Sequence, residues 1–166
     1  MPASVKLVTW NVNSIRQRME RLIALLARHA PDVVCLQETK VTDADFPAAA
    51  LRETGYATAF AGQKSYNGVA ILAKSEPAEV TCGFRDGADD GQARLIAATV
   101  AGIRVVNVYV PNGQAIDSDK YRYKLAWFPA LAAMLRAELA RNPALAVLGD
   151  FNVAPDDRDV HDPALW

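Results

Sequence analysis

The 166-residue chain has few cysteines, no long apolar run and no large excess of charge of either sign. Two cysteines, Cys35 and Cys82, are too few for a disulfide framework, and the apolar neighbours of Cys35 predict a buried thiol. The longest nearly apolar stretch, residues 126–135, is far shorter than the ~18 residues that a membrane span needs. No apolar segment typical of a secretion signal follows Met1. These absences predict a protein of the cytoplasm that does not span a membrane.

The formal net charge is −1. Proteins that hold nucleic acid by charge alone are usually strongly basic, so this balance disfavours a passive nucleic-acid binder. An enzyme acting on nucleic acid needs only a local positive strip, and its metal ion adds charge that the count omits. The length and the 51% hydrophobic content suit one domain with its own core, so we treat residues 1–166 as a single domain.

Helix patterns alternate with strand patterns along the chain. Apolar residues at helical spacing after Ser14 predict a helix that starts with a capping box between Ser14 and Gln17 and stops at Pro31. A long helix is expected over residues 118–142, and Pro129 should interrupt it, because an interior proline costs ~3 kcal/mol or kinks the helix. The remaining expected elements are a short helix over residues 46–54 and strands over residues 5–10, 33–36, 56–61, 68–73, 78–84, 94–100, 103–110 and 145–148.

The connections between these elements indicate the fold class. A hairpin is expected around Ala101 and Gly102, whereas helices separate other strands. This mixture of hairpins and crossovers predicts an α/β fold with mixed sheets rather than a purely parallel sheet. An acidic, glycine-containing loop over residues 86–92 is expected to be mobile.

Polar residues follow several apolar strands at the point where each ends: Asn11, Glu38, Tyr109 and Asp150. Taken singly, each has an ordinary explanation as a turn former, a solvated carboxylate or a core residue. Their coincidence favours a site, because ligand sites of α/β proteins are commonly built at the carboxyl ends of strands. Residues two apart in an extended chain face the same way, so Asn13, Lys40 and Asn152 should point with them into one cavity.

Five segments resemble the motifs of the exonuclease III family, in family order and over essentially the whole chain. They are residues 9–16 (TWNVNSIR), 36–40 (LQETK), 66–70 (YNGVA), 107–113 (NVYVPNG) and 149–155 (GDFNVAP). The resemblance implies a DNase I-like four-layered α/β sandwich, two mixed sheets packed face to face with helices outside. It also implies that the chain lacks the C-terminal third of the family domain, including its closing Ser-Asp-His motif. His29 and His161 do not match that histidine.

Family members act on phosphate esters with Mg²⁺ or Mn²⁺, and the residues suit that chemistry. Mg²⁺ binds through one or two carboxylates, so Glu38 is the expected main ligand, and Asn11 is expected to be a ligand or to orient a metal-bound water. Asp150 is expected to activate the attacking water. Amide groups of Asn112 and Asn152 would bind phosphate oxygens, and Tyr109 would contact the phosphate or assist the leaving group. Expected DNA contacts, each also explicable as a solvated surface residue, are Arg16, Lys40, Tyr66, Arg94, Lys120 and Lys124.

The resemblance therefore implies a DNA-repair nuclease that cuts duplex DNA at abasic sites and trims its 3′ ends. Two alternatives stay open. One is another phosphoesterase of the same fold, such as a lipid or inositol phosphatase. The other is a catalytically incomplete fragment that only binds or self-associates, because a missing part of the domain would expose apolar surface. We expect a complete member of the family to be a monomer.

Overall fold

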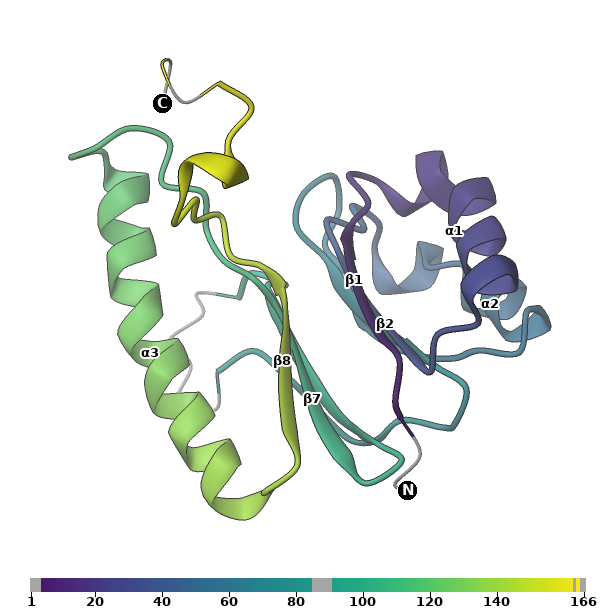
Figure 1. Ribbon diagram of the computed structural model, residues 1–166. Coiled ribbons are helices and arrows are strands. Elements are labelled where there is room, and N and C mark those ends of the chain that lie inside the picture. The colour runs from purple at the N-terminus through teal and green to yellow at the C-terminus, as the bar shows by residue number, and fades with distance from the viewer. Residues whose placement is uncertain (1–3, 85–90, 163, 165–166) are drawn as a thin grey trace.

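In the computed structural model, which describes residues 4–84, 91–162 and 164, the chain folds into four layers (Figure 1). Two four-stranded sheets pack face to face, with α1 (Ile15–His29) and α2 (Ala48–Glu53) outside one sheet and α3 (Asp119–Arg141) outside the other. This arrangement is the four-layered sandwich of mixed sheets that the sequence predicted. Most of the expected acidic loop, residues 86–90, lies outside the described residues.

Each sheet contains one parallel pair of strands joined by a helix. The first sheet has the order β1-β2-β4-β3, with β1 Leu7–Asn11, β2 Val33–Gln37, β3 Ala57–Ala61 and β4 Val69–Ala73. The second has the order β5-β6-β7-β8, with β5 Ala78–Cys82, β6 Leu95–Val100, β7 Ile103–Tyr109 and β8 Leu145–Asp150. Helix α1 connects the parallel strands β1 and β2, and α3 connects β7 and β8. A parallel pair needs such a long crossover, whereas antiparallel neighbours such as β6 and β7 share a short turn.

Side chains of β2 alternate between two apolar layers. Val34 and Leu36 pack in a cluster with α1 and α2, whereas Val33 and Cys35 face the second sheet. The entire strand is buried, as expected for a strand covered on both faces. A third apolar cluster, which includes Trp127, fills the space between the second sheet and α3. The four layers are thus held together by three apolar clusters.

Two predicted details of the helices are wrong. Ser14 has a φ of 86°, and within the described residues its side chain forms no capping box with Gln17. Instead, the backbone N–H groups of Ser14 and Ile15 donate to the carbonyl oxygens of Glu38 and Thr39, at 2.8 and 3.1 Å, so the loop after β2 caps α1. Pro129 does not interrupt α3, which runs unbroken from Asp119 to Arg141.

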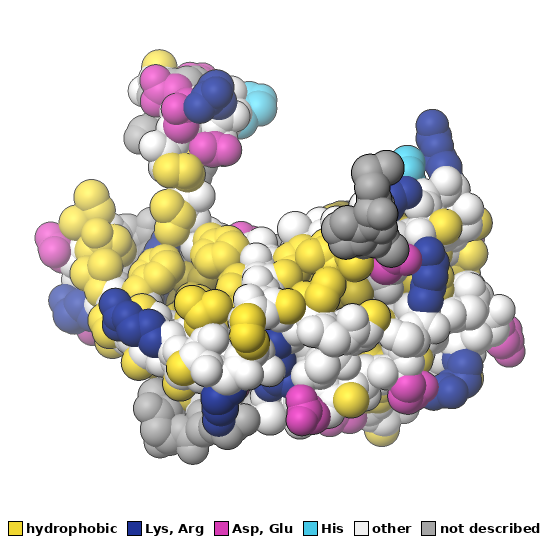
Figure 2. Space-filling model, turned by 60° about the horizontal axis from the view of Figure 1, so that its bottom comes forward, with side chains coloured by type: hydrophobic (Ala, Val, Ile, Leu, Met, Phe, Trp, Pro, Cys, Tyr) yellow, Lys and Arg dark blue, Asp and Glu magenta, His cyan; other side chains and the backbone are white. Residues whose placement is uncertain are grey.

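Hydrophobic side chains gather across the middle of the face drawn in Figure 2, and Lys and Arg side chains lie toward its margins. The acidic segment after β8 projects from the body of the molecule (Figures 1 and 2). Short 3₁₀ turns occur at Asp43–Asp45 and Asp157–Asp159. Among the described residues, no helix combines the length and the apolar character that crossing a membrane requires.

Candidate active site

Four polar side chains from both sheets meet where β1, β2, β7 and β8 end. The side-chain nitrogen of Asn11 donates to Glu38 Oε1 and to Asp150 Oδ2, at 2.8 Å each. The hydroxyl of Tyr109 donates to the same Glu38 oxygen at 2.9 Å. Asn11 and Glu38 follow strands of the first sheet, and Tyr109 and Asp150 end strands of the second. The sequence-based expectation that these residues converge is confirmed.

Residues spaced by two also meet, but the cause is local turn geometry rather than an extended chain. The backbone N–H of Asn13 donates to Asn11 Oδ1 at 3.0 Å, and that of Asn152 donates to Asp150 Oδ1 at 2.9 Å. Such contacts are typical of Asn and Asp turns. Asn13 and Asn152 have φ values of 42° and 49°, in the left-handed region that Asn tolerates better than most residues. The turns fix one carboxylate or amide oxygen at the end of each strand.

Glu38 and Lys40 are brought together by a strained loop. Their φ values are 54° and 57°, a left-handed conformation that costs residues with a Cβ roughly 1–2 kcal/mol each. The loop is held by backbone hydrogen bonds from Thr39 to Gly68 at 3.1 Å and from Lys40 to Asn67 at 3.0 Å. In this conformation Lys40 Nζ lies 2.8 Å from Glu38 Oε2. Strain of this kind persists where neighbouring structure enforces it and is concentrated at functional sites.

The contacts around Glu38 and Tyr109 set their protonation. Burial by itself would raise the pKa of Glu38, but hydrogen bonds from Asn11, Lys40 and Tyr109 outweigh it and hold the pKa below its ordinary value. Burial, reinforced by the hydrogen bond to Glu38, raises the pKa of Tyr109 to about 12. The Arg94 guanidinium lies 4.8 Å from the centre of the Tyr109 ring and opposes that rise. At neutral pH the site therefore holds an ionised carboxylate and a protonated phenol.

Beside this cluster lies a pair of amides. Asn112 Nδ2 donates to Asn152 Oδ1 at 3.4 Å, and Asn152 Nδ2 donates to the carbonyl oxygen of Val110 at 2.8 Å. The ammonium group of Lys124 donates to the backbone carbonyl of Asn152. Gln114 N donates to Asn112 Oδ1 at 2.8 Å, which fixes the orientation of the Asn112 amide.

A surface cavity of about 460 Å³ opens beside the cluster. It brings together Glu38, Tyr109 and Asn112 with four of the six residues expected to contact DNA, namely Lys40, Tyr66, Arg94 and Lys120. An adjacent cavity of about 510 Å³ is lined by Lys124, Asn152 and again Asn112. Arg16 lines neither cavity and forms a 3.0 Å ion pair with Asp45 instead.

Sequence reasoning missed the amides that position Arg94. Asn67 Nδ2 donates to Gln63 Oε1 at 2.8 Å and to Gln92 Oε1 at 3.3 Å, and Arg94 Nε donates to the same Gln92 oxygen at 2.7 Å. Asn67 stands in the segment YNGVA and could have been found there. Two buried amides, Gln37 and Asn107, were also assigned no function, because an amide within an apolar strand gives no sequence signal of its partner.

The donor atoms suit a hard divalent cation. No group of three or more His, Cys, Asp and Glu residues gathers in the described part of the chain. Glu38 and Asp150 nevertheless place two carboxylates on either side of the Asn11 amide. Mg²⁺ is commonly bound by only one or two carboxylates and keeps several waters or substrate oxygens. The chemistry of these side chains is therefore compatible with Mg²⁺ or Mn²⁺.

Comparison with known proteins agrees with this geometry. Residues 8–165 match the model of the Endonuclease/Exonuclease/phosphatase family. Exodeoxyribonuclease III of Haemophilus influenzae is 33% identical over 161 residues, covering 94% of this chain and 60% of that protein. A 3′ phosphatase, NExo, from Neisseria, solved with a product DNA hairpin, is 48% identical with a TM-score of 0.94. An AP endonuclease from Archaeoglobus fulgidus is 44% identical with a TM-score of 0.91.

The match is nearly complete for this chain and partial for its relatives. The match covers 98% of this chain but only 63% of each of the two solved structures. The chain thus spans about three fifths of the length of the proteins that it matches.

Proposed function

The chain belongs to the endonuclease/exonuclease/phosphatase family, and on that basis we propose that it is a DNA-repair nuclease that uses a divalent metal ion. Its fold is the DNase I-like sandwich of two mixed sheets with flanking helices. In this proposal it hydrolyses phosphodiesters at abasic sites and at the 3′ ends of duplex DNA. The names of its relatives, an exodeoxyribonuclease, an AP endonuclease and a 3′ phosphatase crystallised with DNA, support that substrate class.

The observation that carries the proposal is the amide of Asn11 between the carboxylates of Glu38 and Asp150, with 2.8 Å to each. Two carboxylates in one place would repel each other in the absence of a cation or a donor between them. Glu38 lines a cavity together with Lys40 and Arg94, and Asp150 contacts Asn152, which lines the adjacent cavity. One carboxylate to hold a cation, a second to accept a proton and side chains that attract phosphate together suit the hydrolysis of a phosphate ester.

Glu38 would hold the metal ion, with Asn11 as a further ligand or as the group that orients a metal-bound water. When bound, Mg²⁺ or Mn²⁺ would neutralise charge on the phosphoryl oxygens and favour ionisation of water. Asp150 would accept the proton of the attacking water. Its two oxygens already receive hydrogen bonds from Asn11 and from the backbone of Asn152, so the carboxylate is oriented before substrate binds.

Three further side chains would bind the phosphate. Asn112 and Asn152 lie together next to Asp150, and their amide groups would donate hydrogen bonds to oxygens that gain negative charge. Tyr109 stays protonated at neutral pH because its pKa is raised to about 12, so it would act as a hydrogen-bond donor and not as a base. It would contact the phosphate or assist the leaving oxygen.

The cations near the cavity would bind the DNA backbone. Lys40, Arg94, Lys120 and Lys124 line the two cavities, and Tyr66, whose surface is 70% exposed, adds an aromatic face. Phosphate contacts of this kind make affinity fall steeply with salt. Arg16 would take part only by exchanging its exposed ion pair with Asp45 for a phosphate, which costs little at the surface. We also propose a cytoplasmic location for the protein. Its two cysteines form no disulfide, as is usual in the reducing cytoplasm.

A panel of substrates tests the proposal. The protein, in the full length that its gene encodes, would be assayed on a duplex with one tetrahydrofuran abasic analogue, a duplex with a 3′ phosphate and an inositol polyphosphate. We expect it to process the DNA substrates and to bind them more tightly than the inositol phosphate. Hydrolysis of the inositol phosphate alone would favour the alternative phosphatase.

A further inference from the structure

We infer that Gln37 and Asn107 are positioning residues whose buried amides hold the two sheets in the alignment that brings Glu38 and Asp150 together. This inference rests on the proposed function of the site. The two halves of the site belong to different sheets, so its geometry depends on how one sheet lies on the other. Gln37 immediately precedes Glu38, and Asn107 lies two residues before Tyr109 on the same face of β7.

The two amides meet inside the apolar layer between the sheets. Gln37 is 1% exposed and Asn107 is 0% exposed. Gln37 Nε2 donates to Asn107 Oδ1 at 2.7 Å. Asn107 Nδ2 in turn donates to two backbone carbonyls of the first sheet, those of Leu36 at 2.8 Å and Ala70 at 2.9 Å. A single side chain of β7 therefore makes three hydrogen bonds to β2 and β4 of the opposite sheet.

Hydrogen bonds define the alignment in a way that the surrounding apolar contacts do not. The layer between the sheets contains small side chains such as Ala59, Ala73 and Ala98, which make contacts without directional preference. Sliding the sheets would leave buried amide groups unpaired, at about 1–3 kcal/mol for each group. A fully paired buried polar network is thus suited to specify one alignment.

Further bonds tie the pair to the strands that carry the site. Gln37 Nε2 also donates to Thr9 Oγ1 and to the carbonyl oxygen of Cys35, at 3.1 Å each. Thr9 lies two residues before Asn11 on β1. The amide pair, with Gln37 on β2 and Asn107 on β7, therefore links β1, β2 and β4 of the first sheet to β7 of the second. These strands include β1, β2 and β7, three of the four whose ends carry Asn11, Glu38, Tyr109 and Asp150.

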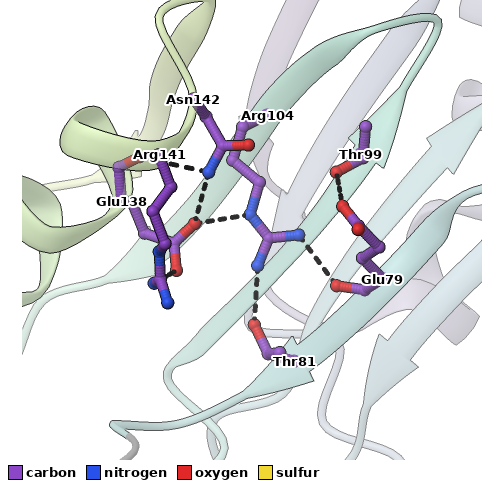
Figure 3. Close-up of polar contacts among 7 residues, drawn as sticks. All are labelled: Glu79, Thr81, Thr99, Arg104, Glu138, Arg141 and Asn142. Atoms are coloured by element: carbon purple, nitrogen blue, oxygen red, sulfur yellow. Dashed lines mark hydrogen bonds and ion pairs between the residues drawn. The ribbon is translucent and has the colours of Figure 1, made fainter.

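A second buried polar cluster provides a matched control. Arg104, near the opposite end of β7 from Tyr109, donates to Glu138 of α3 at 2.8 Å, to the carbonyl oxygen of Glu79 at 2.8 Å and to Thr81 Oγ1 at 2.9 Å (Figure 3). The Arg104 and Glu138 side chains are each 3% exposed. This cluster fastens α3 to the second sheet and makes no contact with the first sheet among the residues drawn. Changing it should alter stability without altering the alignment of the two sheets.

The experiment compares wild type and three variants: Gln37→Leu, Asn107→Leu and the control double variant Arg104→Met/Glu138→Leu. Thermal melts are recorded first, and every protein is then measured at a temperature at which it is folded. Mn²⁺ affinity is measured by titration calorimetry, and the side-chain NH₂ signals of Asn11 are followed by NMR. Steady-state kinetics on the abasic duplex, using the full-length product, give kcat and KM separately.

We expect Asn107→Leu to weaken Mn²⁺ binding and lower kcat roughly tenfold to a hundredfold, since displacement of catalytic groups by about 1 Å can have an effect of that size. KM for DNA should change little, because the hydrogen bonds of the pair go to amide, hydroxyl and backbone groups and not to the Lys and Arg side chains that would bind DNA. The Asn11 NH₂ signals should move toward those of a solvated amide, and Gln37→Leu should act in the same direction. The control double variant should keep the wild-type values of all these quantities.

A folded Asn107→Leu variant with wild-type Asn11 signals, Mn²⁺ affinity and kcat would overturn the inference. So would equal losses in the control variant, since they would reflect stability alone. If the wild-type protein neither binds Mn²⁺ nor cleaves DNA, the proposed function fails. The Asn11 signals of the variants then still decide whether the amide pair aligns the sheets.

Discussion

The side-chain nitrogen of Asn11 donates a 2.8 Å hydrogen bond to the carboxylate of Asp150, 139 positions further along the chain. Asn11 ends β1 in the first sheet, and Asp150 ends β8 in the second. The contact therefore joins the first and the last strand of the fold across the sandwich. The same nitrogen holds Glu38, so one amide links two carboxylates that come from opposite sheets.

Glu38→Gln should raise the Mg²⁺ concentration needed for activity and leave the fold intact. The low pKa of Glu38 keeps its carboxylate ionised at neutral pH, and the amide would remove that charge. We expect the midpoint of Mg²⁺ activation to rise roughly a hundredfold or more, since even indirect partners of metal ligands contribute ten- to a hundredfold. Metal titrations of DNA cleavage check this, with the exposed Glu20→Gln on α1 as control. An unchanged midpoint would remove Glu38 from the metal site.

Asp150→Asn should lower kcat while metal and DNA binding persist. A positioned general base commonly contributes about 10²- to 10⁴-fold to the rate, and the variant loses it. Single-turnover cleavage at saturating Mg²⁺ measures the chemical step, and fluorescence anisotropy measures DNA binding. If the rate stays within threefold of wild type, water activation belongs to another group.

Gly68→Ala should destabilise the fold and displace the loop that carries Glu38. Gly68 has a φ of 89°, and an added Cβ would lie 2.1 Å from Thr39 Oγ1. Gly102→Ala is the matched control, because Gly102 also has a positive φ, 80°, but an added Cβ would meet no atom within 4 Å. Both variants carry backbone strain of about 1 kcal/mol, and Gly68→Ala should lose clearly more free energy of unfolding. Equal losses in urea denaturation would contradict the close packing of Thr39 on Gly68.

The two thiols should differ in reactivity. Burial raises the pKa of Cys35 to about 12, so at pH 8 its reactive thiolate form is scarce, and its side chain is fully buried. Cys82 is exposed and can be reached by a reagent. Partial desolvation of its thiol, and then the negative charge of Asp43, raise its pKa as well. Ellman's reagent should therefore titrate one thiol in the native protein, slowly, and two in guanidinium chloride. Rapid reaction of both thiols in the native protein would show that the core opens around β2.

Buried apolar runs made most of the fold predictable. The strands at Val33–Gln37 and Val69–Ala73 are buried at every position, and such continuous runs are typical of strands covered on both faces. The hairpin at Ala101 and Gly102 was predictable because two turn residues separate two apolar strands. The capping box at Ser14 was wrong because a tertiary contact replaces it: the carbonyl oxygen of Glu38 accepts from the backbone N–H of Ser14, to which the Gln17 side chain would have bonded. Local patterns do not contain that information.

The convergence of four polar side chains was predictable, and the geometry of their contacts was less so. Asn11, Glu38, Tyr109 and Asp150 share one signal, a polar residue at the end of an apolar strand, and they do converge. The left-handed conformation of Glu38 could not be read from its sequence, because a backbone contact with the segment at Gly68 enforces it. The partners of buried amides such as Asn107 lie on distant strands and stay hidden for the same reason.

The most direct test of the central claim is cleavage of a duplex carrying one tetrahydrofuran abasic analogue by the full-length product, with Mg²⁺ and with EDTA, for wild type and for a Glu38→Gln/Asp150→Asn double variant. The account predicts a cut at the analogue by wild type with Mg²⁺, and no cut with EDTA or by the double variant. Cleavage that persists in EDTA, or in the double variant, would contradict a metal-dependent site built from Glu38 and Asp150.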